Sequence, residues 1–140
     1  MKVKLLLTGK TADRWIREGM EVYAARIGHY VPFEVLEVAE GQILKNIRPG
    51  DYTVLLDERG SSFSSTDWAR NLEQKAAHLP KDLVFVIGGP YGFSQALYDR
   101  SDELLSLSRM TMSHQLVRLV FLEQLYRAMT ILKGEHYHHE

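Results

Sequence analysis

The stretch LVFVIGGPYG, residues 83–92, decides the fold class of this chain. Residues 83–88 form a continuous apolar run, which is typical of a central strand buried on both faces of a parallel sheet. Gly88 and Gly89 carry no Cβ, so a ligand can lie against the backbone there. A tight turn between a strand and a helix uses glycines in the same way, so this loop alone leaves both interpretations open.

Strands and helices alternate on both sides of this stretch. Apolar runs predict strands over residues 2–8, 33–38, 52–57, 83–88 and 104–107. Helical spacing and capping residues predict helices over residues 11–29, 42–47, 65–78, 95–100 and 114–133. This order predicts an α/β fold, a single domain over residues 1–140 with helices on both faces of a parallel sheet. Ligands in such sheets bind beyond the carboxyl ends of the strands, so the loops after the last three strands are the expected site.

Composition excludes several classes of protein. The chain has 140 residues and no cysteine, which excludes a disulfide scaffold, a thiol nucleophile and a cysteine metal site. Its 17 basic and 18 acidic residues argue against a broad basic surface for nucleic acid, although charge can be segregated. No apolar run approaches the ~20 residues that cross a bilayer, so we expect no membrane partner and a cytoplasmic location.

The last predicted helix, residues 114–133, carries apolar side chains around nearly its whole circumference. Such a helix must be buried all round. We expect a second copy of the chain to cover its outer side, giving a homodimer through this helix. The other interpretation is a central core helix in a monomer.

Two further segments bear on chemistry. Residues 107–113, LSRMTMS, contain two methionines and three hydroxyls, which suit either a soft pocket for a flat apolar group or a connecting loop. The end of the chain, GEHYHHE at 134–140, holds three histidines whose spacing is poor for a metal, so no metal site is predicted. A histidine there suits a general base near neutral pH.

No hydrolytic motif stands out. Asp57 and Glu58 are adjacent in a predicted strand, point to opposite faces and cannot act as a close pair. Residues 59–62 are expected to form a loop, after which Ser65 or Thr66 caps a helix.

Taken in order, several segments carry a specific resemblance. They are LLDERG at 55–60, FVIGGPYG at 85–92, LS with Thr111 and His114 at 107–114, VR at 117–118, EQLYRA at 123–128 and YH at 137–138. As a set they resemble the RlmH family of SPOUT methyltransferases over nearly the whole chain. The resemblance implies a deep trefoil α/β knot, a homodimer, S-adenosylmethionine as cofactor, and methylation of N3 of a pseudouridine in 23S ribosomal RNA.

The resemblance also implies site residues. Those matching the family's cofactor-binding segments are Leu56, Gly88, Gly89, Leu107, Ser108, Arg109, Met110, Thr111 and Met112. Those matching the RNA side, where catalysis is expected, are His114, Arg118, Arg127, Tyr137 and His138. Among the tail histidines His138 is the first candidate for the base and His136 the second, because removal of the imide proton makes N3 a better nucleophile. Arg118 or Arg127 could hold a phosphate or stabilise the anionic base.

The chain departs from that family in one respect. Many relatives carry a longer, lysine-rich helical stretch where this chain has only residues 39–50, which reduces a basic surface. Balanced charge suggests weak binding of free RNA, so the large subunit or the whole ribosome is the expected partner. Two other functions remain open: a non-enzymatic ribosome- or nucleotide-binding domain, and a small-molecule methyltransferase or nucleotide-binding enzyme.

Overall fold

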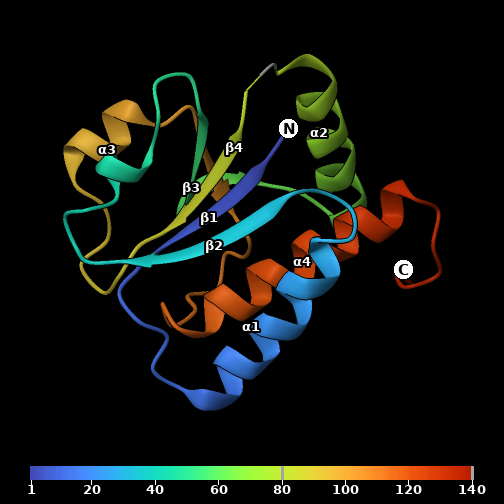
Figure 1. Cartoon of the computed structure of the whole chain (residues 1–140), viewed down its shortest axis with the longest axis horizontal. Helices are drawn as coiled ribbons and strands as arrows, with labels where there is room; N and C mark the ends of the chain where they lie inside the picture. The colour runs from blue at the N-terminus through green and yellow to red at the C-terminus, as the bar shows by residue number, and fades with distance from the viewer. Residues whose placement is uncertain (80, 140) are drawn as a thin grey trace.

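The computed structural model describes residues 1–79 and 81–139, and its centre is one five-stranded sheet (Figure 1). All neighbouring strands are parallel, in the order β2-β1-β4-β3-β5. The strands are β1 (Val3–Thr8), β2 (Phe33–Val38), β3 (Tyr52–Ser62), β4 (Leu83–Ile87) and β5 (Glu103–Ser106). The predicted parallel α/β sheet is therefore confirmed, and β4, the apolar run of the opening stretch, is buried at every position.

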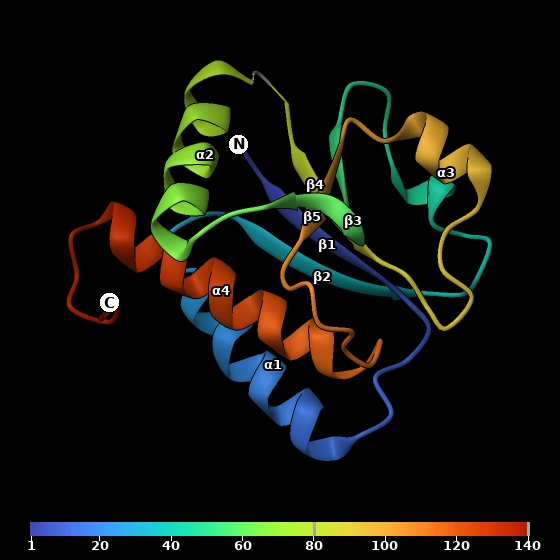
Figure 2. The same cartoon turned by 180° about the vertical axis from the view of Figure 1, so that it is seen from behind.

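Helices cover both faces of the sheet, as expected from the alternation. The helices are α1 (Arg14–Ile27), the single-turn η1 (Leu44–Asn46), α2 (Ser65–His78), α3 (Gln95–Arg100) and α4 (Leu116–Leu132). Figures 1 and 2 show α1, α2 and α4 together on one face, and α3 with η1 on the other. Side chains alternate accordingly: Leu5 and Phe85 join the larger core, while Leu6 and Val86 join the smaller one.

Helix α4 lies at the centre of the larger layer. It packs between α1 and α2, and every one of its residues is buried or half-buried. A single chain thus supplies most of the burial that its apolar circumference requires. Leu116 and Val120, four residues apart on the outer side, are half-exposed and belong to neither core.

One predicted boundary is wrong in a way that matters for the site. Residues 59–62 were expected to form a loop, but β3 continues to Ser62 and pairs a second time with β5. Leu56 and Ser61 both face Leu105, so residues 57–60 bulge out of the sheet between the two pairings. A Cβ on Gly60 would lie 2.4 Å from the backbone of Leu104, so only glycine fits there.

The helix ends need smaller corrections. The cap of α2 is Ser64 rather than Ser65 or Thr66, and its hydroxyl accepts a hydrogen bond from the Asp67 amide. The first helix begins at Arg14 and ends at Ile27, inside its expected bounds.

Candidate functional site

The largest cavity opens at the carboxyl ends of β3, β4 and β5, where the parallel topology predicted a site. Its volume is about 660 Å³, within the range of pockets that hold small organic ligands. Seven of the residues expected to bind a cofactor line it: Leu56, Gly88, Gly89, Leu107, Ser108, Met110 and Met112. The other two, Arg109 and Thr111, are exposed and lie outside the lining.

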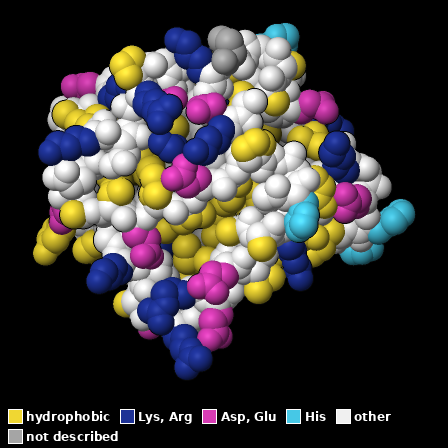
Figure 3. Space-filling view, in the orientation of Figure 1, with side chains coloured by type: hydrophobic (Ala, Val, Ile, Leu, Met, Phe, Trp, Pro, Cys, Tyr) yellow, Lys and Arg dark blue, Asp and Glu magenta, His cyan; other side chains and the backbone are white. Residues whose placement is uncertain are grey.

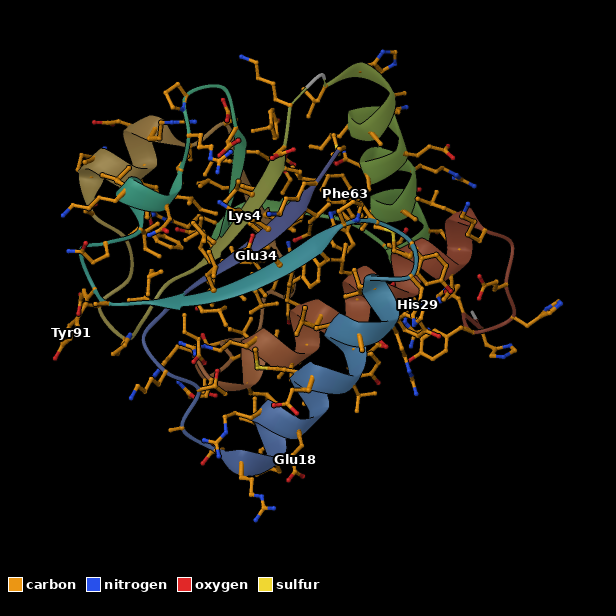
Figure 4. All side chains as sticks on the ribbon, viewed as in Figure 1. Lys4, Glu18, His29, Glu34, Phe63 and Tyr91 are labelled. Atoms are coloured by element: carbon orange, nitrogen blue, oxygen red, sulfur yellow. The ribbon has the colours of Figure 1, made fainter. Side chains whose placement is uncertain are left out.

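The glycine loop after β4 forms one wall of the cavity. The Gly92 amide donates to the Gly89 carbonyl at 3.1 Å, and Gly92 has a φ of +73°, which favours glycine. Tyr91 is 84% exposed at the outer edge of the molecule (Figure 4). The loop therefore presents backbone rather than a bulky side chain to the cavity.

The loop after β5 forms the opposite wall. The Ser106 hydroxyl donates to the Ser108 carbonyl, and the Ser108 hydroxyl accepts from the Met110 amide. These short-range hydrogen bonds order the first part of segment 107–113. Composition alone suited this segment either to a ligand pocket or to a connecting loop, and the structure shows that it lines the cavity. His114, at the end of this loop, also lines the cavity.

A polar cluster that sequence analysis missed stands on the β3 side of the cavity. It consists of Asp57, Arg59 and Tyr98, all of which line the cavity. The Asp57 carboxylate accepts hydrogen bonds from Arg59 and from the Tyr98 hydroxyl. Strand alternation does not signal this cluster, because residues 57–60 bulge out of the sheet and Tyr98 comes from α3.

Arg118 occupies a different environment from the one expected. It is fully buried, and its guanidinium donates to the carbonyls of Thr8, Gly9 and His114 and to the Thr11 hydroxyl. The nearest carboxylate is Glu37, at 3.7 Å. Arg118 therefore ties the start of α4 to the end of β1 and does not face the cavity.

The remaining expected catalytic residues gather where the tail packs on α4. Arg127 forms an ion pair with Glu123 at 2.9 Å, lies 3.0 Å from Nδ1 of His138, and stands over the Tyr137 ring. The Tyr137 hydroxyl donates to the same Glu123 carboxylate, and burial followed by its polar neighbours raises the pKa of Tyr137. His136 is exposed.

The tail cluster and the cavity contact different parts of α4. The cavity reaches Val117 in the first turn of this helix, and the tail packs back on Glu123 and Arg127, roughly 9 and 15 Å further along the helix axis. Figures 1 and 2 both show the C-terminal segment far from the loops at the start of α4. Within one chain the structure brings His114 to the cavity but leaves Arg127, Tyr137 and His138 away from it.

The surface carries mixed charge. Figure 3 shows Lys and Arg interspersed with Asp and Glu over the viewed face, consistent with the balanced net charge. Over residues 1–79 and 81–139, no helix is long and apolar enough to cross a membrane. In the same residues no group of three or more His, Asp or Glu side chains gathers as a metal site would.

A parallel α/β sheet with a mixed polar and apolar cavity at its strand tips defines a class of small enzymes that bind a nucleotide-like cofactor. The family described as "Predicted SPOUT methyltransferase" matches residues 1–138. The chain belongs to this SPOUT methyltransferase family.

Relatives with known names agree with the family match. The chain is 48% identical to "Ribosomal RNA large subunit methyltransferase H" of Parabacteroides distasonis, with all of both chains covered. It is 44% identical to the protein of that name from Cytophaga hutchinsonii, covering 99% of this chain and 100% of the relative. The first alignment spans 157 positions, 17 more than the 140 residues of this chain.

Solved structures agree on the fold. A probable methylase family protein from Haemophilus influenzae has a TM-score of 0.56 at 12% identity, covering 99% of this chain and 70% of its own. The SpoU methyltransferase AviRb from Streptomyces viridochromogenes, solved with AdoMet, has a TM-score of 0.54 at 13% identity, covering 96% and 59%. At these identities the likeness concerns the fold alone.

Proposed function

We propose that the chain is an S-adenosylmethionine-dependent methyltransferase that modifies N3 of a pseudouridine in 23S ribosomal RNA. The observation that carries the proposal is the strand-tip cavity, whose walls are the segments that the resemblance assigns to the cofactor. Family membership and relatives named as large-subunit methyltransferases support the reaction class and the RNA. They weigh against the non-enzymatic alternative.

The cavity fits this cofactor in size and chemistry. Its apolar residues include Ile87, Leu107 and Met112, which suit a flat adenosyl group, and Gly88 and Gly89 expose backbone groups for the ring edges. When bound, S-adenosylmethionine supplies an activated methyl group. The protein must then orient the target base and exclude water, which is catalysis by positioning.

The expected catalytic residues receive distinct roles in this proposal. His138 is the proposed base for the imide proton, oriented by Arg127 at its Nδ1, with the exposed His136 as second candidate. Tyr137 shares the Glu123 carboxylate with Arg127 and completes this cluster. His114 lines the cavity, which supports a role for this residue in contacting the substrate.

Arg118 is proposed as a positioning residue rather than a substrate ligand. Its guanidinium donates to the end of β1, to the loop that follows, and to the segment just before α4. It acts through His114, whose carbonyl it holds.

A homodimer would bring the tail cluster of one protomer to the cavity of the other. The tail cluster lies on Arg127, roughly 15 Å along α4 from Val117 at the cavity, and a second copy placed with α4 reversed can bring its tail to that cavity. Half-exposed Leu116 and Val120 support contact along this helix. In this proposal the tail of one protomer completes the cavity of its partner.

Mixed dimers test the shared site. The variant His138→Ala lacks the base, and Gly88→Val narrows the cavity, since a Cβ at Gly88 already lies 3.1 Å from Phe93. Each alone should be inactive. Co-refolded in equal amounts, they should recover about a quarter of wild-type activity, because half of the dimers carry one complete site. No recovery, with mixed dimers shown by mass spectrometry, would place the site within one chain.

The substrate is tested by transfer of a labelled methyl group to free 23S RNA, large subunits and whole ribosomes, followed by mass mapping of the modified nucleoside. Label on small metabolites instead would favour the remaining alternative enzyme. The ribosomal substrate also implies the cytoplasm. The proposal also includes a single domain over residues 1–140 and the trefoil knot of this family. Removal of the residues beyond α4 should leave the five-stranded sheet folded.

A further inference from the structure

The polar cluster at the β3 bulge is not explained by the segments assigned to the cofactor. The cavity lining draws on both faces of the sheet: Ile87 and Leu107 belong to the larger core on the α4 face, whereas Tyr98 of the cluster packs on the smaller core on the α3 face. Among the described residues that line the cavity, Arg59 is the single Lys or Arg. A ligand carboxylate inside this cavity therefore has one strong cationic partner.

The Arg59 guanidinium is held in one orientation. Its Nε and Nη2 donate to the two oxygens of Asp57, each at 3.2 Å, and Nη2 also donates to the Tyr98 hydroxyl at 2.6 Å. The guanidinium carbon lies 5.2 Å from the centre of the Tyr98 ring. Among residues 1–79 and 81–139 no acceptor takes a hydrogen bond from Nη1, so this end of the fork is available to a ligand.

The two partners differ in exposure. The Asp57 side chain is 10% exposed, whereas that of Arg59 is 71% exposed. The Arg59 hydrogen bonds, helped by that of Tyr98 and opposed by burial, lower the pKa of Asp57 to about 2. Asp57 thus stays ionised at any working pH and acts as the fixed anchor of the cation.

The backbone places this cluster at the cavity. Residues 57–60 bulge between the two pairings of β3 with β5, and Gly60 packs against the Leu104 backbone. The bulge therefore carries Asp57 and Arg59 away from the sheet and toward the cavity, where α3 adds Tyr98.

The geometry points to Arg59 as the residue that binds the α-carboxylate of S-adenosylmethionine, with Asp57 and Tyr98 as its positioning residues. This inference rests on the proposed function. The amino-acid part of the cofactor then lies against the polar cluster and the adenosyl part against Ile87 and Leu107. The cluster thereby sets the direction in which the cofactor enters.

Calorimetry on the full chain tests the inference without any turnover. The ligands are S-adenosylmethionine, S-adenosylhomocysteine, and 5′-methylthioadenosine, which lacks the amino-acid part. Arg59→Gln should weaken the first two about 10- to 100-fold and the third less than about twofold. Tyr98→Phe, a milder change, should weaken the first two about threefold and leave the third unchanged. Arg70→Gln, which alters an exposed arginine on α2, is the matched control.

Three results would overturn the inference. Equal weakening of all three ligands would assign Arg59 a purely structural role. Unchanged cofactor affinity with a raised KM for ribosomal RNA would make Arg59 an RNA phosphate ligand. Failure of the wild-type chain to bind any of the three ligands would instead remove the proposed function together with the inference.

Discussion

The two ends of α4 carry arginines in opposite environments. Arg118, near the cavity end, is fully buried and bonded to three backbone carbonyls. Arg127, near the tail end, is about a quarter exposed, with a side-chain exposure of 23%, and is bonded to side chains of its own helix and of the tail.

The two environments suit different roles, one structural and one chemical. A guanidinium enclosed among backbone carbonyls has no donor to offer a substrate and instead fixes the segments around it. A guanidinium at the surface, paired with a carboxylate and a histidine, can orient a proton-transfer group. Of the two arginines that the sequence nominated equally, only Arg127 has a partly exposed guanidinium, so our proposal gives the catalytic role to the Arg127 cluster and a positioning role to Arg118.

The largest expected difference is in the free energy of unfolding of two matched variants, Arg118→Met and Arg127→Met. Arg118→Met leaves buried carbonyls without donors and should lower the free energy of unfolding by about 3–5 kcal/mol. Arg127→Met removes a partly exposed pair and should cost about 1 kcal/mol or less. Urea unfolding followed by circular dichroism measures both. Equal losses in the free energy of unfolding would mean that the two arginines contribute equally to stability.

The next largest effect is expected at the tail. His138→Ala should lower kcat about 100-fold or more, because a positioned base is lost, and should leave affinity for S-adenosylmethionine unchanged. Single-turnover methylation and calorimetry provide the two measurements. His78→Ala, at the exposed end of α2, serves as the control. Unchanged turnover would remove His138 from the mechanism and bring His136 forward.

Acid titration examines the cavity end. The pKa of Asp57 is about 2 in the folded chain against an ordinary 3.8, so its ionised form stabilises the fold above pH 4. This contribution, on the order of 1–2 kcal/mol, should be lost as the pH falls from about 4 to about 2. Asp57→Asn should flatten that part of the stability profile, and the exposed Asp67→Asn should not. Parallel profiles for Asp57→Asn and wild type would contradict the stabilising ion pair of the largely buried Asp57 with Arg59.

Alkaline titration examines the tail end and should show the smallest effect. Burial, followed by the hydrogen bond to Glu135, raises the pKa of Tyr30 to about 12. Stability from the neutral hydroxyl is present below pH 10 and should decline as the pH rises toward 12. Tyr30→Phe should lack this decline, measured as thermal unfolding against Tyr91→Phe, an exposed tyrosine. A decline of equal size in both variants would contradict a stabilising hydrogen bond between Tyr30 and Glu135.

Much of the fold was predictable from local pattern. The strand at 33–38 and the short helix at 95–100 have the predicted bounds, and β4 is central and buried as its apolar run indicates. The cavity walls were predictable too, because carboxyl ends of parallel strands meet at one edge. The bulge at 57–60 was not, because it depends on the second pairing with β5, some 45 residues further along the chain.

The sequence by itself determined the parallel sheet, the buried helix α4 and the loops that line the cavity, since these follow from local periodicity and from the order of strands and helices along the chain. Only the tertiary structure decided which charged side chains are enclosed. Arg118 is buried by contact with Thr8, which is 110 residues away in sequence. The packing of the tail residues Tyr137 and His138 on Glu123 and Arg127 of α4 was likewise decided by the tertiary structure. Burial of a charge depends on which distant segments surround it, and no local pattern records that.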